Sequence, residues 1–201
     1  MGIGLALVGN SRAKARQAGC LSNLKVIGRA QRLFSDGSDS RYVTSSPGNL
    51  SEGKDYVPGK SSLAECYAAL GKELSSPKVL LCPVDQEGKT RDLSSVDFAG
   101  LTGQAISYFI GIEAIEEKFQ MILSGDRNLC SDSDGNQLFP ADGVRTNALK
   151  LTASWHRETI HGGRGNIGLA DGSVRQADTK ALLEILSKTG DSHNTVLLPK
   201  P

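Results

Sequence analysis

The stretch CLSNLKVIGRAQRLF, residues 20–34, decides the fold because its apolar side chains recur at the spacing of one helix face. The recurring positions lie three, four and seven residues apart, and further apolar residues widen the stripe: Cys20, Leu24, Ile27 and Phe34, with Leu21, Ala30 and Leu33 beside them. Only scattered glycine interrupts the helical pattern from about Leu5 to Ser35, and the preceding SRAKARQAG is basic and almost without large apolar residues. We therefore expect a long N-terminal helix over residues 1–36, solvated in its first half and packed on a domain in its second.

The remaining residues, 37–201, alternate short apolar runs with loops rich in turn-forming residues. Ser62 with Glu65 forms a capping box ahead of LAECYAALGKEL (63–74), and Asp178 and Gly190 bound a helix over TKALLEILSK. Four segments are typical of strands: KVLLCP (78–83), AISYFIGI (105–112), QMILSG (120–125) and TASW (152–155). These elements predict an α+β fold in one domain, residues 1–201, with a long N-terminal α-helix packed on a small, mainly antiparallel β-sheet with extensive loops.

The stretch HGGRGNIGLADGSV, residues 161–174, predicts a hairpin. Asp171 and Gly172 stand between two apolar or alternating segments, which is the strongest short-range hairpin signal. We expect a type I′ turn at this pair, since that turn needs positive φ at both positions.

Composition excludes some classes of protein. Hydrophobic residues make up 38% of the 201 residues, which is too apolar for wholesale disorder, and a net charge of +1 creates no overall field toward nucleic acid. Basic residues are dispersed without interleaved aromatics, so we expect no nucleic-acid partner. The apolar run before Asn10 has about eight residues, against the roughly 20 that span a bilayer. We expect the chain as given to be soluble.

The four cysteines form no CxxC pair and no Cys/His group at zinc spacing, so a structural zinc site is not indicated. Cys20 lies on the apolar stripe and is most simply a core residue. Cys66 and Cys82 flank one short helix and strand, and are the favoured bridge if the compartment is oxidising. No partner is indicated for Cys130.

His161 and Asp171 have three interpretations: a general base with the carboxylate that orients it, two ligands of a metal ion, or parts of a hairpin without a chemical role. In the chemical interpretation, Asp126, His161 and Asp171 surround one ion in a metal-dependent hydrolase. In the structural interpretation, which we favour, His161 hydrogen-bonds a backbone carbonyl and organises the loop.

Two oxygen-rich segments are candidates for a calcium site. GDRN (125–128) offers the oxygens of Asp126 and Asn128, and its Arg127 could pair with a carboxylate. DSDGN, with Asp132 and Asp134, is similar to the front of a calcium loop, but its glycine comes too early and no glutamate follows at the twelfth position. A loose calcium site and a solvated turn both remain open.

Four phrases in order resemble a known family over about residues 11 to 176. SRAKARQAGCLSNLKVIGRAQRLFSDGSDSRYV resembles the end of the long helix of type IV pilin-like proteins, especially type II secretion pseudopilins, in its C-x-x-N-L-K-x-I-G form. KVLLCPVD is similar to that group's CP-x-D segment. SYFIGI with ILSGDRN, and the spacing from His161 to Asp171-Gly172, resemble the prepilin-type, processing-associated H-X9-DG group.

The resemblance implies a non-catalytic subunit of a periplasmic pseudopilus, which self-associates through its N-terminal helix. Other pseudopilins and the secretion machinery would be its partners, and the full-length form would be anchored in the inner membrane. The chain departs from the family at its start, where GIGLALVG replaces the expected peptidase site and apolar helix. Carried over by motif, the calcium candidates are Asp126, Asn128, Asp132 and Asp134, and the loop organisers are His161, Asn166, Asp171 and Gly172. A calcium-stabilised extracytoplasmic binding module remains an alternative.

Overall fold

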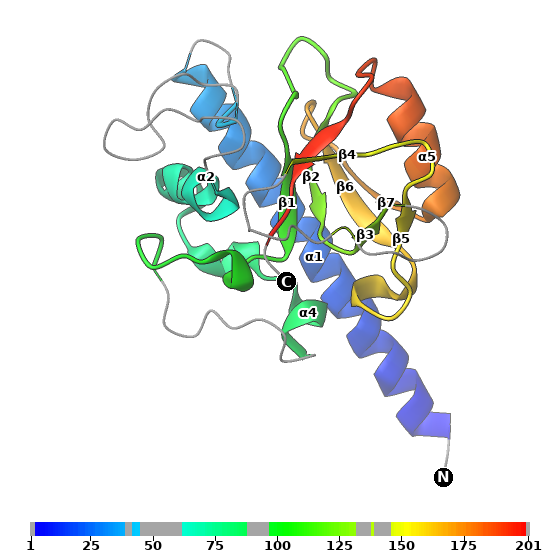
Figure 1. Cartoon of the computed structure of the whole chain (residues 1–201). Coiled ribbons are helices and arrows are strands. Elements are labelled where there is room, and N and C mark those ends of the chain that lie inside the picture. The colour runs from blue at the N-terminus through cyan, green and yellow to red at the C-terminus, as the bar shows by residue number, and fades with distance from the viewer. Residues whose placement is uncertain are drawn as a thin grey trace.

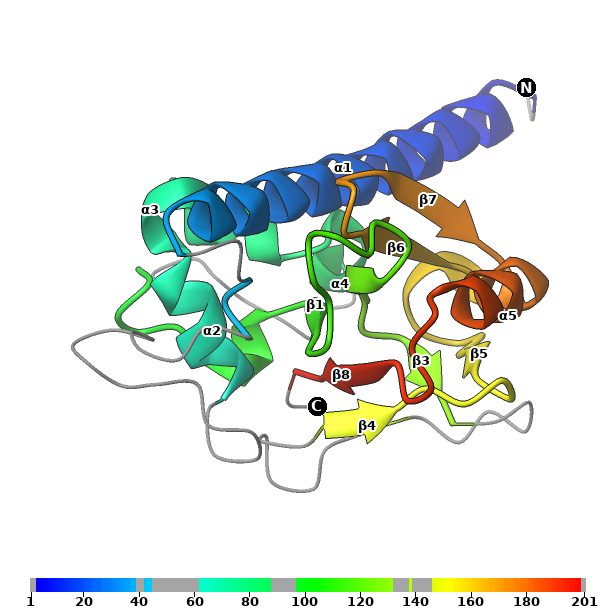
Figure 2. The ribbon, with the colours of Figure 1, turned by 90° about the horizontal axis from the view of Figure 1, so that it is seen from above.

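The computed structural model describes residues 3–38, 42–44, 62–87, 97–131, 138 and 146–199. Its longest element is α1, Ile3–Asp36, so the predicted N-terminal helix is confirmed. In Figures 1 and 2, α1 lies along one side of the other elements, and its first turns run past them. Within the described ranges, no helix combines the length and the apolar character needed to cross a membrane.

The apolar stripe of α1 is buried where the periodicity predicts it. The positions without exposed surface are Cys20, Leu24, Ile27 and Ala30. Phe34 is half-buried, but Leu33 is 48% exposed and lies outside the stripe that it was expected to widen. The neighbouring exposed positions Arg29, Arg32 and Asp36 show that Leu33 lies on the solvent side of the helix.

Residues 62–87 form short helices joined by one or two non-helical residues. The capping box is confirmed, since the Ser62 N–H donates to Glu65 over 2.7 Å and the Glu65 N–H donates to Ser62 Oγ over 3.2 Å. The expected single helix is divided at Leu70 into α2, Leu63–Ala69, and α3, Gly71–Leu74.

The strand predicted at KVLLCP is wrong. The chain instead forms a 3-10 turn, η1, Pro77–Leu80, and a short helix, α4, Pro83–Glu87. Each begins with a proline, whose fixed φ and missing N–H suit the first position of a helical turn. The apolar run KVLL therefore serves to bury Leu80 and Leu81, rather than to pair in the sheet.

The sheet has six strands in the order β4-β8-β1-β2-β6-β7, and each neighbouring pair is antiparallel. Their bounds are β1 Tyr108–Gly111, β2 Ile122–Asp126, β4 Thr146–Ala148, β6 Gly165–Leu169, β7 Val174–Ala177 and β8 Thr195–Leu197. A second sheet pairs β3, Leu129–Cys130, with β5, Ser154–Trp155. The other elements are η2, Gly103–Ala105, η3, Ile160–Gly162, and α5, Thr179–Lys188. The α+β class and the antiparallel sheet are thus confirmed.

The sheet separates two apolar cores. Strand β1 alternates between them, because successive side chains of a strand point to opposite faces. Tyr108 and Ile110 pack with the buried stripe of α1, whereas Phe109 packs with Trp155 and the inner face of α5. Helix α5 begins at the predicted cap, where Asp178 Oδ1 accepts the Ala181 N–H over 2.9 Å. The long helix and α5 therefore cover opposite faces of the sheet.

The β6–β7 hairpin is confirmed, but its turn is not type I′. Among the described residues of the turn, only Gly172 has positive φ, at 80°. The Gly172 N–H donates to Leu169 O and the Leu169 N–H donates to Ser173 O, each over 2.9 Å. This pattern is a three-residue loop with its last residue in the left-handed region. The tip rests on α1, where Arg32 Nη1 donates to Asp171 O over 3.0 Å.

Two glycines, Gly28 and Gly172, face each other at this contact. We expect Gly28→Ala and Gly172→Ala to change the free energy of unfolding in opposite directions. A Cβ on Gly28 would lie 3.9 Å from Gly172 Cα, an ordinary contact. Alanine should therefore raise the free energy of unfolding by about 0.5–1 kcal/mol through helix propensity. Alanine at Gly172 should lower it by about 1–2 kcal/mol, because of its positive φ. Urea unfolding of both variants measures the two values, and destabilisation by Gly28→Ala would contradict the described contact.

Candidate functional site

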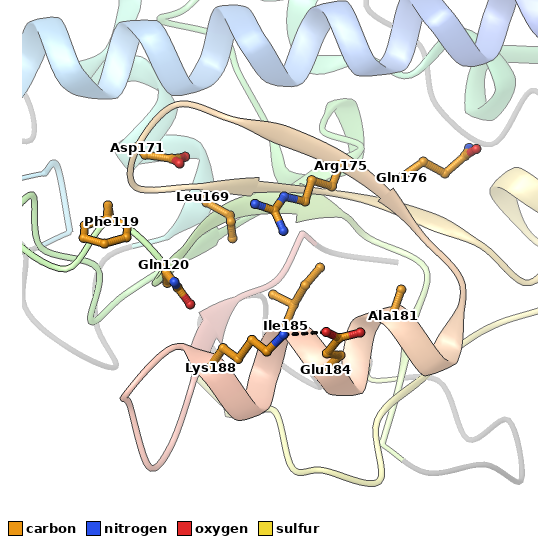
Figure 3. A pocket seen from close by; sticks show the side chains of 10 residues that line it. All are labelled: Phe119, Gln120, Leu169, Asp171, Arg175, Gln176, Ala181, Glu184, Ile185 and Lys188. Atoms are coloured by element: carbon orange, nitrogen blue, oxygen red, sulfur yellow. Dashed lines mark hydrogen bonds and ion pairs between the residues drawn. The ribbon is translucent and has the colours of Figure 1, made fainter.

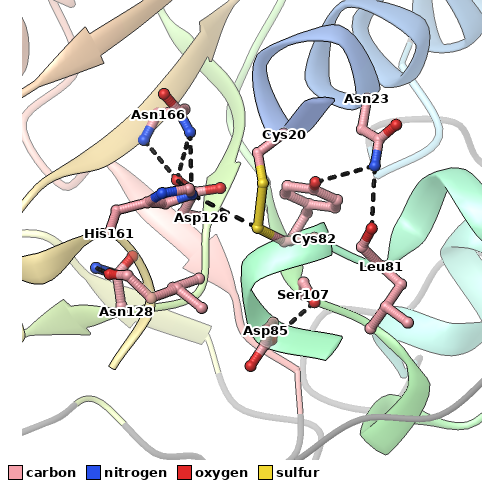
Figure 4. The surroundings of a disulfide bond; sticks show 12 residues. Cys20, Asn23, Leu81, Cys82, Asp85, Ser107, Asp126, Asn128, His161 and Asn166 are labelled. Carbon is pink, nitrogen blue, oxygen red and sulfur yellow. Dashed lines mark hydrogen bonds and ion pairs between the residues drawn. A yellow bond between two sulfur atoms is a disulfide. The ribbon is translucent and has the colours of Figure 1, made fainter. Parts of the chain in front are cut away.

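A disulfide joins α1 to the segment ahead of α4. Cys20 is bonded to Cys82, 62 residues away, with the Cα atoms 5.1 Å apart (Figure 4). The favoured Cys66–Cys82 bridge is therefore wrong. Cys66 and Cys130 are buried outside the disulfide, and burial raises the pKa of the Cys66 thiol to about 12. Which cysteines meet is decided by the packing of α1 against η1 and α4, which spacing along the chain does not reveal.

Asn23, one turn beyond Cys20, strengthens this junction. Its Nδ2 donates to Leu81 O over 3.0 Å and to the hydroxyl of Tyr108 over 3.3 Å. The cysteine and the asparagine of the C-x-x-N phrase thus hold adjacent residues, Cys82 and Leu81.

Beside the disulfide lies a wholly buried carboxyl group, that of Asp126 at the end of β2. Its Oδ2 accepts two hydrogen bonds from Asn166 of the neighbouring strand β6, from the backbone N–H over 2.7 Å and from Nδ2 over 2.8 Å. The same oxygen lies 3.3 Å from His161 Nε2. Asp126 Oδ1 is buried and has no hydrogen-bond partner among the described residues.

His161 reaches this carboxyl group because the chain folds back sharply before β6. His161, Gly162 and Gly163 have φ of 65°, 59° and 79°, three successive left-handed residues. A non-glycine residue in this region costs on the order of 1–2 kcal/mol. The result is an imidazole only 2% exposed, with Nε2 at 3.5 Å from Cys82 Sγ and 3.4 Å from Asn166 Nδ2. The expected contact with a backbone carbonyl is replaced by contacts with side chains.

Asn128 holds the loop that carries His161. Its Nδ2 donates to Ile160 O and to Arg164 O, each over 2.8 Å, and so closes the loop on both sides of the histidine. These bonds use the amide nitrogen, and the predicted calcium ligand, Asn128 Oδ1, is buried without a hydrogen-bond partner among the described residues.

Burial determines the protonation of the Asp126–His161 pair. It raises the pKa of Asp126 to about 8, although the two donors of Asn166 act in the opposite direction. Burial also lowers the pKa of His161, against a smaller opposing effect of Asp85. For both groups, burial therefore favours the uncharged form, a carboxylic acid beside a neutral imidazole, which avoids two buried charges.

A second buried network lies next to the first. Arg127 makes a bidentate pair with Asp85, with Nε to Oδ2 at 2.8 Å and Nη2 to Oδ1 at 2.7 Å. The Ser107 hydroxyl also donates to Asp85 Oδ2, over 2.7 Å. The predicted pairing of Arg127 with a carboxylate is confirmed. The partner, the aspartate of the CP-x-D phrase, was not identified from the sequence.

Of the predicted loop organisers, Asn166 joins the buried pair, whereas Asp171 and Gly172 lie elsewhere. Asp171 follows Leu169, which pairs with Ile122, whereas Asp126 is at the opposite end of β2. The structure thus brings Asp126 and His161 together without Asp171, whose Oδ1 accepts the Ser173 N–H over 2.7 Å. Gly172 shapes the turn, and Asn166 bonds Asp126 directly. Asp132 and Asp134 lie outside the described residues.

Two groups of potential metal ligands occur in the described part of the chain. One comprises Cys20, Cys82 and His161; the other comprises Glu113, Asp191 and His193. In the second group, Glu113 and Asp191 already accept backbone N–H donors of the C-terminal segment. Neither group contains the predicted calcium candidates.

The surface hollows lie away from the buried pair. The one drawn in Figure 3, of about 310 Å³, opens between the β6–β7 hairpin and α5 and is lined by Leu169, Arg175 and Ile185 among others. None of the four hollows characterised in the described part of the chain is lined by Asp126, His161 or Cys82.

We expect Asp126→Asn to change how stability depends on pH. A folded-state pKa of about 8 exceeds the unfolded value of about 3.9, so the folded form holds the proton more tightly. The wild-type chain should therefore lose stability as pH rises from about 4 to 8, by an amount on the order of a few kcal/mol relative to the variant. Urea unfolding between pH 5 and pH 8 measures this difference.

The matched control is Asp178→Asn, the same change at an exposed helix cap where asparagine caps equally well. Curves for Asp126→Asn that run parallel to those of the wild type would contradict a buried, protonated Asp126.

We expect the Cys20→Ala/Cys82→Ala double variant to be less stable by at most roughly 4 kcal/mol, the chain-entropy value for a loop of this length. A reductant in metal-free buffer should lower the stability of the wild type and leave that of the variant unchanged. A wild-type chain indifferent to the reductant, or a peptide map linking Cys66 to Cys82, would contradict the assignment.

Comparison of the chain with models of protein families, with curated proteins and with solved structures finds no match in any of the three. The functional interpretation therefore depends on the residues and the geometry of the chain itself.

Proposed function

We propose that the chain is a non-catalytic structural subunit of a pilin-like filament, similar in role to a type II secretion pseudopilin. The observation that carries the proposal is the way in which α1 is attached. Among the positions of α1 whose burial is described, residues 14–36, the fully buried ones begin at Cys20, whereas residues 14–19 are exposed or half-buried. The first turns run beyond the other elements in Figure 2, as a helix would that packs with other copies of itself.

The buried polar cluster supports a structural role over a catalytic one. Asp126 is wholly buried and the His161 side chain is 2% exposed, so a substrate has no access to the pair. A general base must lie within hydrogen-bond reach of the substrate proton. Instead, the contacts of this pair connect β2, β6 and the disulfide of α1, so they link the sheet to the long helix.

The disulfide supports assignment to an oxidising compartment such as the periplasm, because structural disulfides persist where thiols are not kept reduced. The partners would be further copies and related subunits.

Cross-linking between copies tests the proposal. Ala18→Cys/Arg29→Cys places two thiols on the exposed side of α1, roughly 16 Å apart along the helix axis. In cells that express the gene, a short bis-maleimide should give a ladder of three or more linked copies, because each helix in a filament has neighbours on both sides.

The control, Lys118→Cys/Lys180→Cys, places two thiols on exposed positions away from α1 and should give no ladder. Monomers alone from the α1 variant, or the same ladder from both variants, would count against a filament built on this helix.

A further inference from the structure

We propose that the reduced chain binds one zinc ion through Cys20, Cys82, His161 and Asp126. This metal site is independent of the filament role. In the oxidised chain the same two cysteines form the disulfide. A covalent bond would therefore hold α1 to the rest of the fold in the oxidised state, and a metal ion would hold it in the reduced state.

The spacing of Cys20, Cys82 and His161 fits three ligands of a tetrahedral ion, and Asp126, which lies beside His161, must approach the sulfur atoms to become the fourth. The sulfur atoms of Cys20 and Cys82 and a ring nitrogen of His161 all lie within 4.8 Å of one another. Zinc binds sulfur at about 2.3 Å and nitrogen or oxygen at about 2.0–2.2 Å. In a tetrahedral site, a sulfur ligand and a nitrogen ligand are therefore about 3.6 Å apart, and a nitrogen ligand and an oxygen ligand are about 3.4 Å apart. The observed separation from Cys82 Sγ to His161 Nε2 is 3.5 Å, and the Asp126 oxygen that Asn166 holds, Oδ2, lies 3.3 Å from the same nitrogen, which leaves Oδ1 of this carboxyl group for the ion.

The donor atoms also have the right chemistry. Nε2 of a neutral imidazole is the usual histidine ligand, and it is Nε2 of His161 that lies against Cys82 Sγ. Asp126 Oδ1 is a buried acceptor without a partner among the described residues. The carboxylate can therefore coordinate while Asn166 keeps one of its oxygens hydrogen-bonded, as outer residues do around protein-bound zinc.

A dithiol reductant supplies two electrons and two protons, the bond between the two sulfurs breaks to give two thiols, and the reductant becomes a disulfide. Zinc then displaces both thiol protons and the proton of the Asp126 carboxyl group, which pass to solvent. The sulfur atoms move apart to about 3.8 Å, the separation of two thiolates on one tetrahedral zinc.

Cobalt and zinc titrations of the whole chain test the site. After reduction with a phosphine under nitrogen, Co²⁺ should bind one ion per chain. It should show sulfur-to-cobalt charge-transfer absorption and the visible bands of a tetrahedral ion, and stoichiometric Zn²⁺ should abolish both. The oxidised chain should show neither. Asp126→Asn should weaken zinc binding by at least about tenfold.

Two controls separate the site from adventitious binding. Cys66→Ala/Cys130→Ala should keep the cobalt spectrum, and Cys20→Ala/Cys82→Ala should lose it. If circular dichroism shows that reduction unfolds the metal-free chain, zinc should refold it. A reduced chain that stays folded without cobalt bands, one that zinc fails to refold, or cobalt bands that survive in Cys20→Ala/Cys82→Ala would each overturn the proposal.

Discussion

The burial of the Asp126 carboxyl group is the constraint on which the rest of the structure depends. A carboxyl group without access to water must be protonated or surrounded by donors; here burial raises the pKa of Asp126, and Asn166 supplies two donors. Its donors come from Asn166 on the adjacent strand, and its other neighbour is His161, from a loop forced through three left-handed residues. That histidine in turn contacts Cys82, the cysteine bonded to α1. One buried acid thus connects the middle of the sheet to the long helix.

The phrases that stand far apart in the sequence are neighbours in this arrangement. The C-x-x-N phrase of α1 holds Leu81 and Cys82, and the aspartate of the CP-x-D phrase, Asp85, binds Arg127 of GDRN. At the opposite end of β6, the Asp-Gly turn rests on Arg32 of the same helix. The helix is therefore attached near both ends of its buried half, at Cys20 and at Arg32.

The correct predictions concern features that depend on interactions between residues close together in the chain. The stripe of α1, the Ser62 cap and the Asp178 cap depend on neighbours within four residues, and these predictions are confirmed. The failures depend on contacts distant in sequence. KVLLCP has the composition of a strand but begins its turns with prolines, and Cys20 meets Cys82 only because α1 crosses that segment. The Asp126–His161 contact depends on the register of β2 with β6, and on positive φ at a histidine, which composition does not signal.

Because these contacts join the sheet to α1, we expect the buried Asp126, its partner Asn166 and the long helix to unfold as one cooperative unit. Native-state hydrogen exchange measures this directly, through the backbone N–H of Asn166, which donates to Asp126 Oδ2, and that of Ile27, in the buried stripe of α1. We expect both amides to exchange with the free energy of global unfolding, and to respond equally to denaturant. An Asn166 amide that exchanges through a small local opening, while Ile27 stays protected, would contradict the claim.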